Sequence, residues 1–404
     1  SLLLPVAVHA EAGVSAERTD AALAALELGY LALEAHGWPT PRADGGRDGT
    51  DGFDLHLRSA WSTTDAPSWV PTERAPPERF ARAGLDAMDA KDAVSDVDSG
   101  LTFAEVYAGV PDDRLEACVV SALVEATLLG SDPAEAPSVR RATATFLSWT
   151  WTGRFGCDDE RIASQQTEPA HGWVGHDPST GEGGALFLAS LCERHDDGSG
   201  DWLRDVWNAA RQRSTEGELH AIPDVPWMLV QATELTRTPL VRSVVDFAAS
   251  RWFSGTRRAG ARLRVLRALP DEATPPAWIE TSWARLPRRL LSQEREVEPY
   301  GTAYALVDVR GASAGSRLQV WMEGEYGVEW SLVGMRVGTD GREIGRTLAP
   351  ARDRDPHSYL SIELLEDTSE VVLAVTNLSG RGPDADEPDD HARSFRLTVD
   401  RAGD

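Results

Sequence analysis

Lysine is almost absent from this chain of 404 residues, because Lys91 is the only lysine among its 40 basic residues. The formal net charge is −25. Nucleic-acid binding needs concentrated Lys and Arg that displace counterions from phosphates, so this composition argues against a nucleic-acid partner. The acidic surface predicts a secreted, extracellular or cell-surface protein, and heavy use of Ala, Arg, Gly and Asp is typical of GC-rich bacterial genomes.

Long apolar runs are also missing. No stretch of roughly 18 or more consecutive apolar residues occurs, so we expect no transmembrane segment. The chain does not start with Met, from which we expect a processed product. Its first ten residues have two interpretations: the end of a signal peptide, or a first β-strand over residues 4–11, with Val6, Val8 and Ala10 on one face. We favour the strand.

Cysteine is scarce, with three in the chain. One disulfide and one thiol are therefore allowed. In an exported protein we favour a bond between Cys118 and Cys157, since both lie at ends of expected helices while Cys192 lies on an apolar helical face. Three buried free thiols are the alternative. There is no Cys-x-x-Cys pair, which argues against a structural zinc site.

Histidine pairs with metal-binding spacing are lacking as well. Nine histidines are present, but no two stand four residues apart, the spacing that places two imidazoles on one helical face. His171 and His176 are five apart in expected loop sequence. They form a low-specificity candidate metal site, and surface histidines are the alternative. No Gly-x-Ser-x-Gly motif indicates a serine nucleophile.

One glycine-rich segment offers oxygen ligands instead. Four acids within residues 44–54 are candidate calcium ligands, since calcium prefers carboxylates on tight turns: Asp44, Asp48, Asp51 and Asp54. The spacing does not match a helix-loop-helix calcium loop. The alternative is a polar loop that leads into a strand over residues 53–58. Apart from calcium, the sequence predicts no cofactor.

The chain divides into two regions by the period of its apolar residues. From 15 to 253 the period is helical, with a strand at 53–58 and an irregular segment at 62–99. We expect helices at 15–37, 112–129, 137–152, 183–194, 200–212, 224–235 and 239–253. The predicted first domain covers residues 1–287 and is mostly helical.

Short alternating segments dominate from about residue 256 onward, which predicts an antiparallel β-sandwich over residues 288–404. Either Trp321 or Trp330 is expected on its inner face, and Thr339-Asp340-Gly341 is a candidate hairpin turn. The fold class is therefore α+β. Strands are expected at 262–267, 303–309, 318–323, 328–337, 358–364, 371–378 and 394–399.

Several segments of the chain stand in a characteristic order and spacing: 4–9, 44–54, 118–130, 140–149, 181–187, 202–207, 300–304, 330–332 and 376–378. In this order the chain resembles a family of secreted, predicted zinc metallopeptidases of myxobacteria and their relatives. The resemblance covers most of the chain and implies a zincin-like first domain and an appended β-sandwich.

The resemblance also implies that the metal site is lost. Such peptidases carry His, Glu and His on a first helix and a third ligand, often Glu, on a second helix. By position, Ser121, Ala122 and Glu125 replace the first three residues and Arg141 replaces the third ligand. A guanidinium does not ligate zinc. We expect Glu125 and Arg141 to form an ion pair in the vacated position; the alternative is that both face solvent.

Two functions follow from these observations. The first is a non-catalytic, secreted relative of a zinc metallopeptidase, a pseudoenzyme that serves binding, surface display or self-association with an unidentified protein or surface partner. The second is a hydrolase with an unrecognised metal or nucleophile site near His171 and His176. No catalytic residue is predicted for the first.

Overall fold

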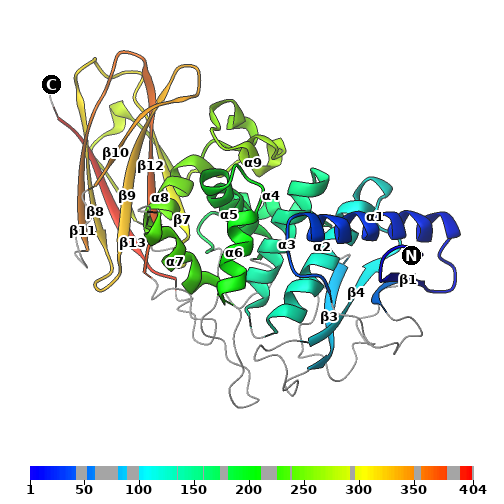
Figure 1. Ribbon diagram of the computed structural model, residues 1–404. Coiled ribbons are helices and arrows are strands. Elements are labelled where there is room, and N and C mark those ends of the chain that lie inside the picture. The colour runs from blue at the N-terminus through cyan, green and yellow to red at the C-terminus, as the bar shows by residue number, and fades with distance from the viewer. Residues whose placement is uncertain are drawn as a thin grey trace. The chain divides into compact units, whose positions relative to one another are not determined.

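The fold class is α+β, as predicted. The computed structural model describes residues 1–41, 52–59, 81–88, 100–133, 135–157, 159–172, 181–210, 225–236, 239–291, 296–349, 356–379 and 392–402 (Figure 1). Backbone contacts divide the chain into two compact units. The first comprises 1–162, 176–232 and 384–386, and the second comprises 163–175, 233–383 and 387–404. Within the described ranges, no helix is both long and apolar enough to cross a membrane.

The first unit contains a four-stranded mixed sheet in the order β1-β2-β4-β3. β1 pairs with β2 and β2 with β4 in parallel, whereas β3 pairs with β4 antiparallel. Parallel neighbours need a crossover connection, and α1 lies between β1 and β2 in the sequence. The bounds are β1 Val6–Ala10, β2 Phe53–Arg58, β3 Ala81–Met88 and β4 Gly100–Tyr107.

Helix α1 (Ala16–Ala35) begins at a capping serine: the Ser15 side chain accepts a hydrogen bond from the backbone N–H of Arg18 at 3.2 Å. The helix ends at Ala35 and is followed, after His36, by Gly37, whose positive φ of 67° suits glycine. α1 packs on β1 and on α2. The approach to α2 is close at Gly29, where an added Cβ would lie 2.9 Å from Leu123.

Helices α2 (Asp112–Ser131) and α3 (Pro137–Thr152) form the centre of the first unit. α2 contacts α1, α3, β3 and β4, and α3 contacts α2 and α5. α3 begins with a proline, which leaves no N–H unsatisfied there, and ends at Gly153 in the left-handed conformation. The other helices of this part of the chain are α4 Asp159–Thr167, α5 Gly181–His195, α6 Asp201–Ala210 and α7 Val225–Leu235.

The second unit contains two sheets. A five-stranded sheet has the order β10-β9-β12-β7-β5, and a four-stranded antiparallel sheet has the order β11-β8-β13-β6. In the first of these only β5 pairs in parallel, with β7. The bounds are β5 Ile279–Ser282, β6 Arg288–Leu291, β7 Thr302–Asp308, β8 Arg317–Gly324, β9 Trp330–Gly338, β10 Glu343–Leu348, β11 His357–Glu363, β12 Thr368–Asn377 and β13 Phe395–Ala402.

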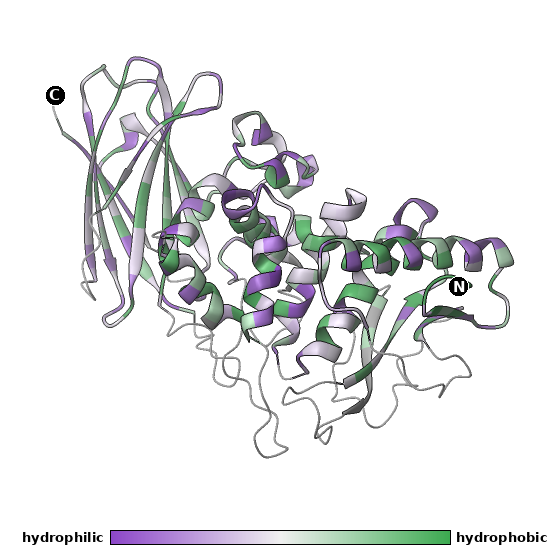
Figure 2. Ribbon diagram, in the orientation of Figure 1, coloured by the Kyte–Doolittle hydropathy of each residue, from purple (hydrophilic) through white to green (hydrophobic). Residues whose placement is uncertain are grey.

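Both sheets of the second unit contribute side chains to one hydrophobic core. At one point of contact, a Cβ added to Gly334 of β9 would lie 2.2 Å from Ile362 of β11. Buried and exposed residues alternate along β8 and β11, and Figure 2 shows hydrophobic and hydrophilic residues interleaved along the strands of this unit. Trp330 faces this core, but Trp321 is 40% exposed. The expectation that either one faces inward therefore holds for Trp330 alone.

Helix α8 (Leu240–Arg251) belongs to the second unit, which therefore begins earlier than the predicted boundary at residue 287. α8 packs on β9 and β12. The hydroxyl of Tyr304 on β7 donates to the carbonyl of Ala248 at 2.5 Å, and its ring lies 5.2 Å from the ring of Trp252. Because α8 covers one face and the second sheet covers the other, β12 is buried on both sides.

Two local predictions are wrong. Residues 262–267 contain the short helix α9 (Arg264–Arg267) instead of a strand, and the guanidinium of Arg267 donates to the carbonyl of Ala261 at 2.9 Å across this turn. The segment 62–99, expected to be irregular, contains β3. The predicted hairpin at Thr339-Asp340-Gly341 is confirmed, because it joins β9 to β10 with the N–H of Gly338 on the carbonyl of Arg342 at 2.9 Å.

Candidate functional site

The four residues for which the sequence resemblance implied a lost metal site lie on α2 and α3. Ser121, Ala122 and Glu125 are on α2, and Arg141 is on α3. α2 is buried on nearly all sides from residue 117 to 129, as befits a helix enclosed by two helices and a sheet. Ser121 is half-buried, whereas the other three side chains are buried.

Glu125 and Arg141 form a buried ion pair between the two helices. Arg141 Nε donates to Glu125 Oε1 at 3.2 Å, and their side chains are 4% and 8% exposed, respectively. A buried carboxylate requires a cation or several donors to remain charged. The guanidinium therefore supplies within the helix pair the positive charge that Glu125 needs.

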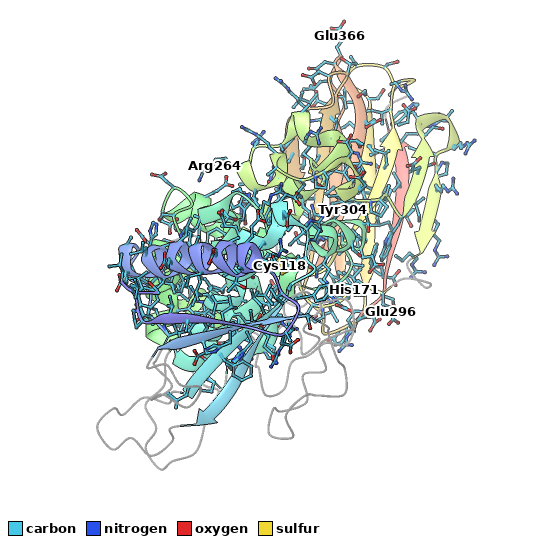
Figure 3. All side chains as sticks on the ribbon, turned by 90° about the vertical axis from the view of Figure 1, so that its right-hand side faces the viewer. Cys118, His171, Arg264, Glu296, Tyr304 and Glu366 are labelled. Carbon is cyan, nitrogen blue, oxygen red and sulfur yellow. A yellow bond between two sulfur atoms is a disulfide. The ribbon has the colours of Figure 1, made fainter. Side chains whose placement is uncertain are left out.

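A disulfide bond is attached to the face of α2 that also carries Ser121 and Glu125. Cys118 and Cys157 are joined by a disulfide bond, the pairing favoured from the sequence, and Figure 3 labels Cys118 within the first unit. Next to Cys157, Gly156 lies so close to Ser121 that an added Cβ would be 3.2 Å from Ser121 Cβ. The segment after α3 thus covers α2 at Cys118 and Ser121, one turn before Glu125. Cys192 is a buried free thiol, and burial raises its pKa well above the usual value.

Hydrogen bonds fix α3 against its neighbours. The hydroxyl of Ser148 donates to the carbonyl of Ala117 on α2 at 3.0 Å. On the side of α6, the indole of Trp207 donates to the hydroxyl of Thr143 at 3.1 Å. Both contacts are buried, so sliding α3 would leave buried polar groups without partners. The separation between Glu125 and Arg141 is consequently set by the packing of the whole helix layer.

These residues do not form a zinc-binding set. Zinc sites use Cys, His, Asp or Glu ligands, and Glu125 is the only such residue among the four. A guanidinium stays protonated and would repel a divalent cation. Among the described residues, no group of three or more His, Cys, Asp or Glu has the geometry to hold a metal ion.

Of the four candidate calcium ligands, Asp54 lies within the described residues. This carboxylate is buried in β2 and lies 2.6 Å from Nε2 of His9 on β1. The ring of His9 stacks on His56 with centroids 5.2 Å apart. Asp54 therefore binds a neighbouring strand. Asp44, Asp48 and Asp51 lie outside the described residues.

The candidate at His171 lies in the second unit and is contacted by two carboxylates. His171 Nδ1 lies 2.8 Å from Glu298 Oε1, and Nε2 lies 3.3 Å from Glu168 Oε2. The hydrogen bond to Glu298 raises the pKa of His171, against a smaller opposing effect of partial burial. The second oxygen of Glu298 accepts from the N–H of Gly172 at 2.9 Å. His171 and Gly172 thus bind the same carboxylate, which holds this turn in place. His176 lies outside the described residues.

One surface feature was missed in the sequence. Trp321 and Tyr359 lie side by side on the outer face of β8 and β11, with ring centroids 5.4 Å apart. The signal was available: Leu318, Val320 and Met322 alternate with polar residues along β8 and are buried, which places Trp321 on the opposite face.

Comparison with known proteins gives little guidance. No protein-family model matches the chain. No curated protein matches it. The pre-peptidase C-terminal domain of collagenase from Bacillus anthracis aligns with a TM-score of 0.20 and 12% identity, over 31% of this chain and 96% of that one. A mutant VP2 protein of infectious bursal disease virus aligns with a TM-score of 0.18 and 13% identity, over 28% of each chain. Scores of this size carry no argument.

Proposed function

We propose that this protein is a non-catalytic relative of a secreted zinc metallopeptidase. The observation that carries the proposal is the buried ion pair between Glu125 and Arg141, at the positions where the resemblance places two zinc ligands. In this account Arg141 takes over the electrostatic role of the metal, because it neutralises the one carboxylate of the set. The position of the water-activating glutamate is held by Ala122, which has no proton-transferring group.

Binding is the role we assign to the protein, on a cell surface or outside the cell. The disulfide between Cys118 and Cys157 supports an oxidising compartment, since such bonds persist there and are rare in cytosol. The zincin-like helical unit serves as a rigid scaffold in this proposal. The second unit, which we interpret as an appended β-sandwich, presents a broad sheet face for recognition.

Zinc content and peptidase activity test the proposal. We expect purified protein, dialysed against zinc and then against buffer, to retain far less than one zinc per chain by mass spectrometry. We also expect no chelator-sensitive peptidase activity. Any cleavage of casein or of a quenched fluorescent peptide should be unaffected by 1,10-phenanthroline. Stoichiometric zinc or chelator-sensitive cleavage contradicts the proposal.

A restoration variant tests the correspondence of the positions. Ser121→His, Ala122→Glu, Glu125→His and Arg141→Glu together place three ligands and a general base on the two helices. We expect this variant to bind about one zinc per chain. The matched control carries the three α2 substitutions and retains Arg141; it should bind zinc far more weakly because the guanidinium remains. A folded restoration variant without zinc shows that the positions do not correspond to a metal site.

A further inference from the structure

The outer face of the four-stranded sheet carries an ordered row of side chains. Strand register places Tyr359 of β11 opposite Trp321 of β8, and Thr398 of β13 on the other side of Trp321. Thr398 in turn lies opposite Arg289 of β6. Cross-strand neighbours in register lie close enough to act together on one ligand. The row therefore crosses all four strands with an aromatic pair at one end.

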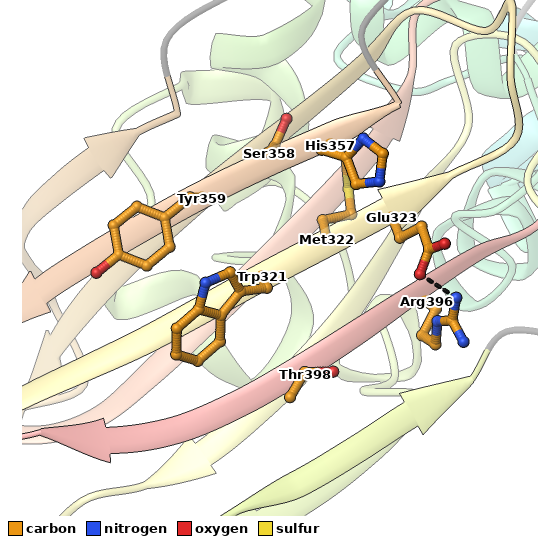
Figure 4. A pocket seen from close by; sticks show the side chains of 8 residues that line it. All are labelled: Trp321, Met322, Glu323, His357, Ser358, Tyr359, Arg396 and Thr398. Carbon is orange, nitrogen blue, oxygen red and sulfur yellow. Dashed lines mark hydrogen bonds and ion pairs between the residues drawn. The ribbon is translucent and has the colours of Figure 1, made fainter.

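The aromatic pair is partly exposed on the outer face of the sheet. Trp321 and Tyr359 are 40% and 43% exposed. Their rings tilt by 44° and together line a pocket of about 180 Å³ on the sheet surface (Figure 4). Covering the exposed surface of a large aromatic side chain with a ligand would release hydrophobic free energy. Two partly exposed aromatic rings that line one pocket indicate a binding platform.

Polar groups of both kinds border the aromatic pair. In the neighbouring row, Glu323 of β8 lies in register with His357 of β11 and Arg396 of β13. Glu323 and Arg396 form an ion pair, drawn in Figure 4, and both line the pocket. Their formal charges cancel, yet a carboxylate has several acceptor sites and a guanidinium has five N–H donors. The pocket thus offers donors and acceptors without a net charge between these two residues.

We propose that this face binds a neutral saccharide chain. A pyranose ring presents an apolar face of C–H groups that stacks on Trp321 or Tyr359, and its rim carries hydroxyls that both donate and accept hydrogen bonds. Glu323 accepts from such hydroxyls, and Arg396 and Thr398 donate to them. The net charge of −25 on the whole chain disfavours acidic polysaccharides, which leaves neutral ones.

A proline-rich peptide fits this pocket less well. Such a peptide also stacks on aromatic side chains, but proline has no N–H and its backbone offers mainly carbonyl acceptors. Such a ligand offers few donors to Glu323, so the carboxylate would lose hydration that its ion pair with Arg396 does not fully replace. A polyhydroxylated ligand satisfies both members of the ion pair.

The test uses the full chain and a panel of neutral polysaccharides. Insoluble cellulose, chitin and β-1,3-glucan are tested by depletion isotherms, and soluble starch, xylan and mannan by affinity electrophoresis. We expect retention on at least one polymer, and Trp321→Ala should weaken it about tenfold or more, as for a central aromatic anchor. Tyr359→Ala should weaken it less, and Trp321→Phe should restore part of the binding.

Tyr326→Ala is the matched control, because Tyr326 is 90% exposed but lies outside the pocket. We expect it to bind like the unaltered protein, and circular dichroism should show every variant to be folded. Retention on none of the polymers overturns the proposal, as does equal binding by Trp321→Ala. Trp321-dependent binding of a proline-rich peptide such as collagen, without polysaccharide binding, also overturns it. The proposal does not rest on the zinc result, so either one can fail alone.

Discussion

The helix pair α2–α3 and the outer face of β8, β11 and β13 differ in which kind of side chain they bury and which kind they expose. The helix pair buries two charges, Glu125 and Arg141, inside a layer of helices. The sheet face leaves the aromatic side chains of Trp321 and Tyr359 partly exposed to water. Each arrangement is unfavourable unless something else compensates it.

The compensation differs between the two regions. In the helix pair it is internal, since each charge is the partner of the other. On the sheet face the free energy of covering two aromatic rings is still available to a ligand. The comparison therefore assigns stability to the first region and recognition to the second. Substitutions in the helix pair should change unfolding, whereas those on the sheet face should change binding.

Removing the buried cation should give the largest effect. Arg141→Ala strands the Glu125 carboxylate between α2 and α3, and we expect a loss of about 3–5 kcal/mol in the free energy of unfolding. Urea unfolding followed by circular dichroism measures it. Glu125→Met with Arg141→Met is the control, since an apolar pair of similar volume should recover most of the loss. A loss below about 1 kcal/mol in the single variant would contradict the prediction, because it would be no larger than the contribution of a typical surface ion pair.

Removing the disulfide should have the next largest effect. Cys118 and Cys157 are 39 residues apart in the sequence, and closing a loop of this size stabilises by about 2–4 kcal/mol through the entropy of the unfolded chain. We expect Cys118→Ala with Cys157→Ala to lower the unfolding free energy by this amount. Cys192→Ala, which removes a buried thiol without breaking a link, is the matched control. Equal losses in both variants would contradict a role for the bond.

A smaller, pH-dependent effect is expected at His171. Its pKa is raised in the folded protein by Glu298, so its contribution is fully present below the unfolded pKa of about 6.5 and is lost as pH rises through the higher folded pKa. Because His171 is half exposed, we expect about 0.2–1 kcal/mol. His171→Asn should flatten the fall in unfolding free energy above pH 6.5, as should Glu298→Gln. An unchanged pH profile in both would contradict the assignment.

The smallest effect on stability should come from the sheet face. Trp321→Ala should change the unfolding free energy by no more than about 0.5 kcal/mol, as at other surface positions. The control is Trp330→Ala on β9 of the other sheet, where removing an indole buried in the core should cost about 3–5 kcal/mol. Comparable losses would show that Trp321 is a packing residue, which would end the contrast between the two regions.

Strong periodicity made parts of the fold predictable. The strand Phe53–Arg58 and the helix Pro137–Thr152 have their expected bounds, because alternation marks the first and a proline start and a glycine end mark the second. β3 was missed since its sequence, rich in Ala and Gly, has weak β-propensity and owes its pairing to β4. Residues 262–267 alternate like a strand but contain the short helix α9. Local patterns do not reveal such tertiary effects.

The candidate sites were predictable to different extents. The contact between Glu125 and Arg141 was expected from the metallopeptidase resemblance, which places both residues at metal-ligand positions on adjacent helices. The domain boundary was not predictable, since it depends on the contact of α8 with β12 and of Tyr304 with Ala248, which join segments far apart in the sequence. The saccharide platform also required strand register, which sets Tyr359 beside Trp321.

A double-mutant cycle on Glu125 and Arg141 tests the central claim most directly. It compares the unfolding free energies of the unaltered chain, Glu125→Ala, Arg141→Ala and the variant with both substitutions. The ion pair at 3.2 Å predicts that the double variant loses less than the sum of the single losses, with a coupling energy of about 0.5–3 kcal/mol. Additive losses would contradict the account, because they would show that Arg141 does not compensate the Glu125 carboxylate.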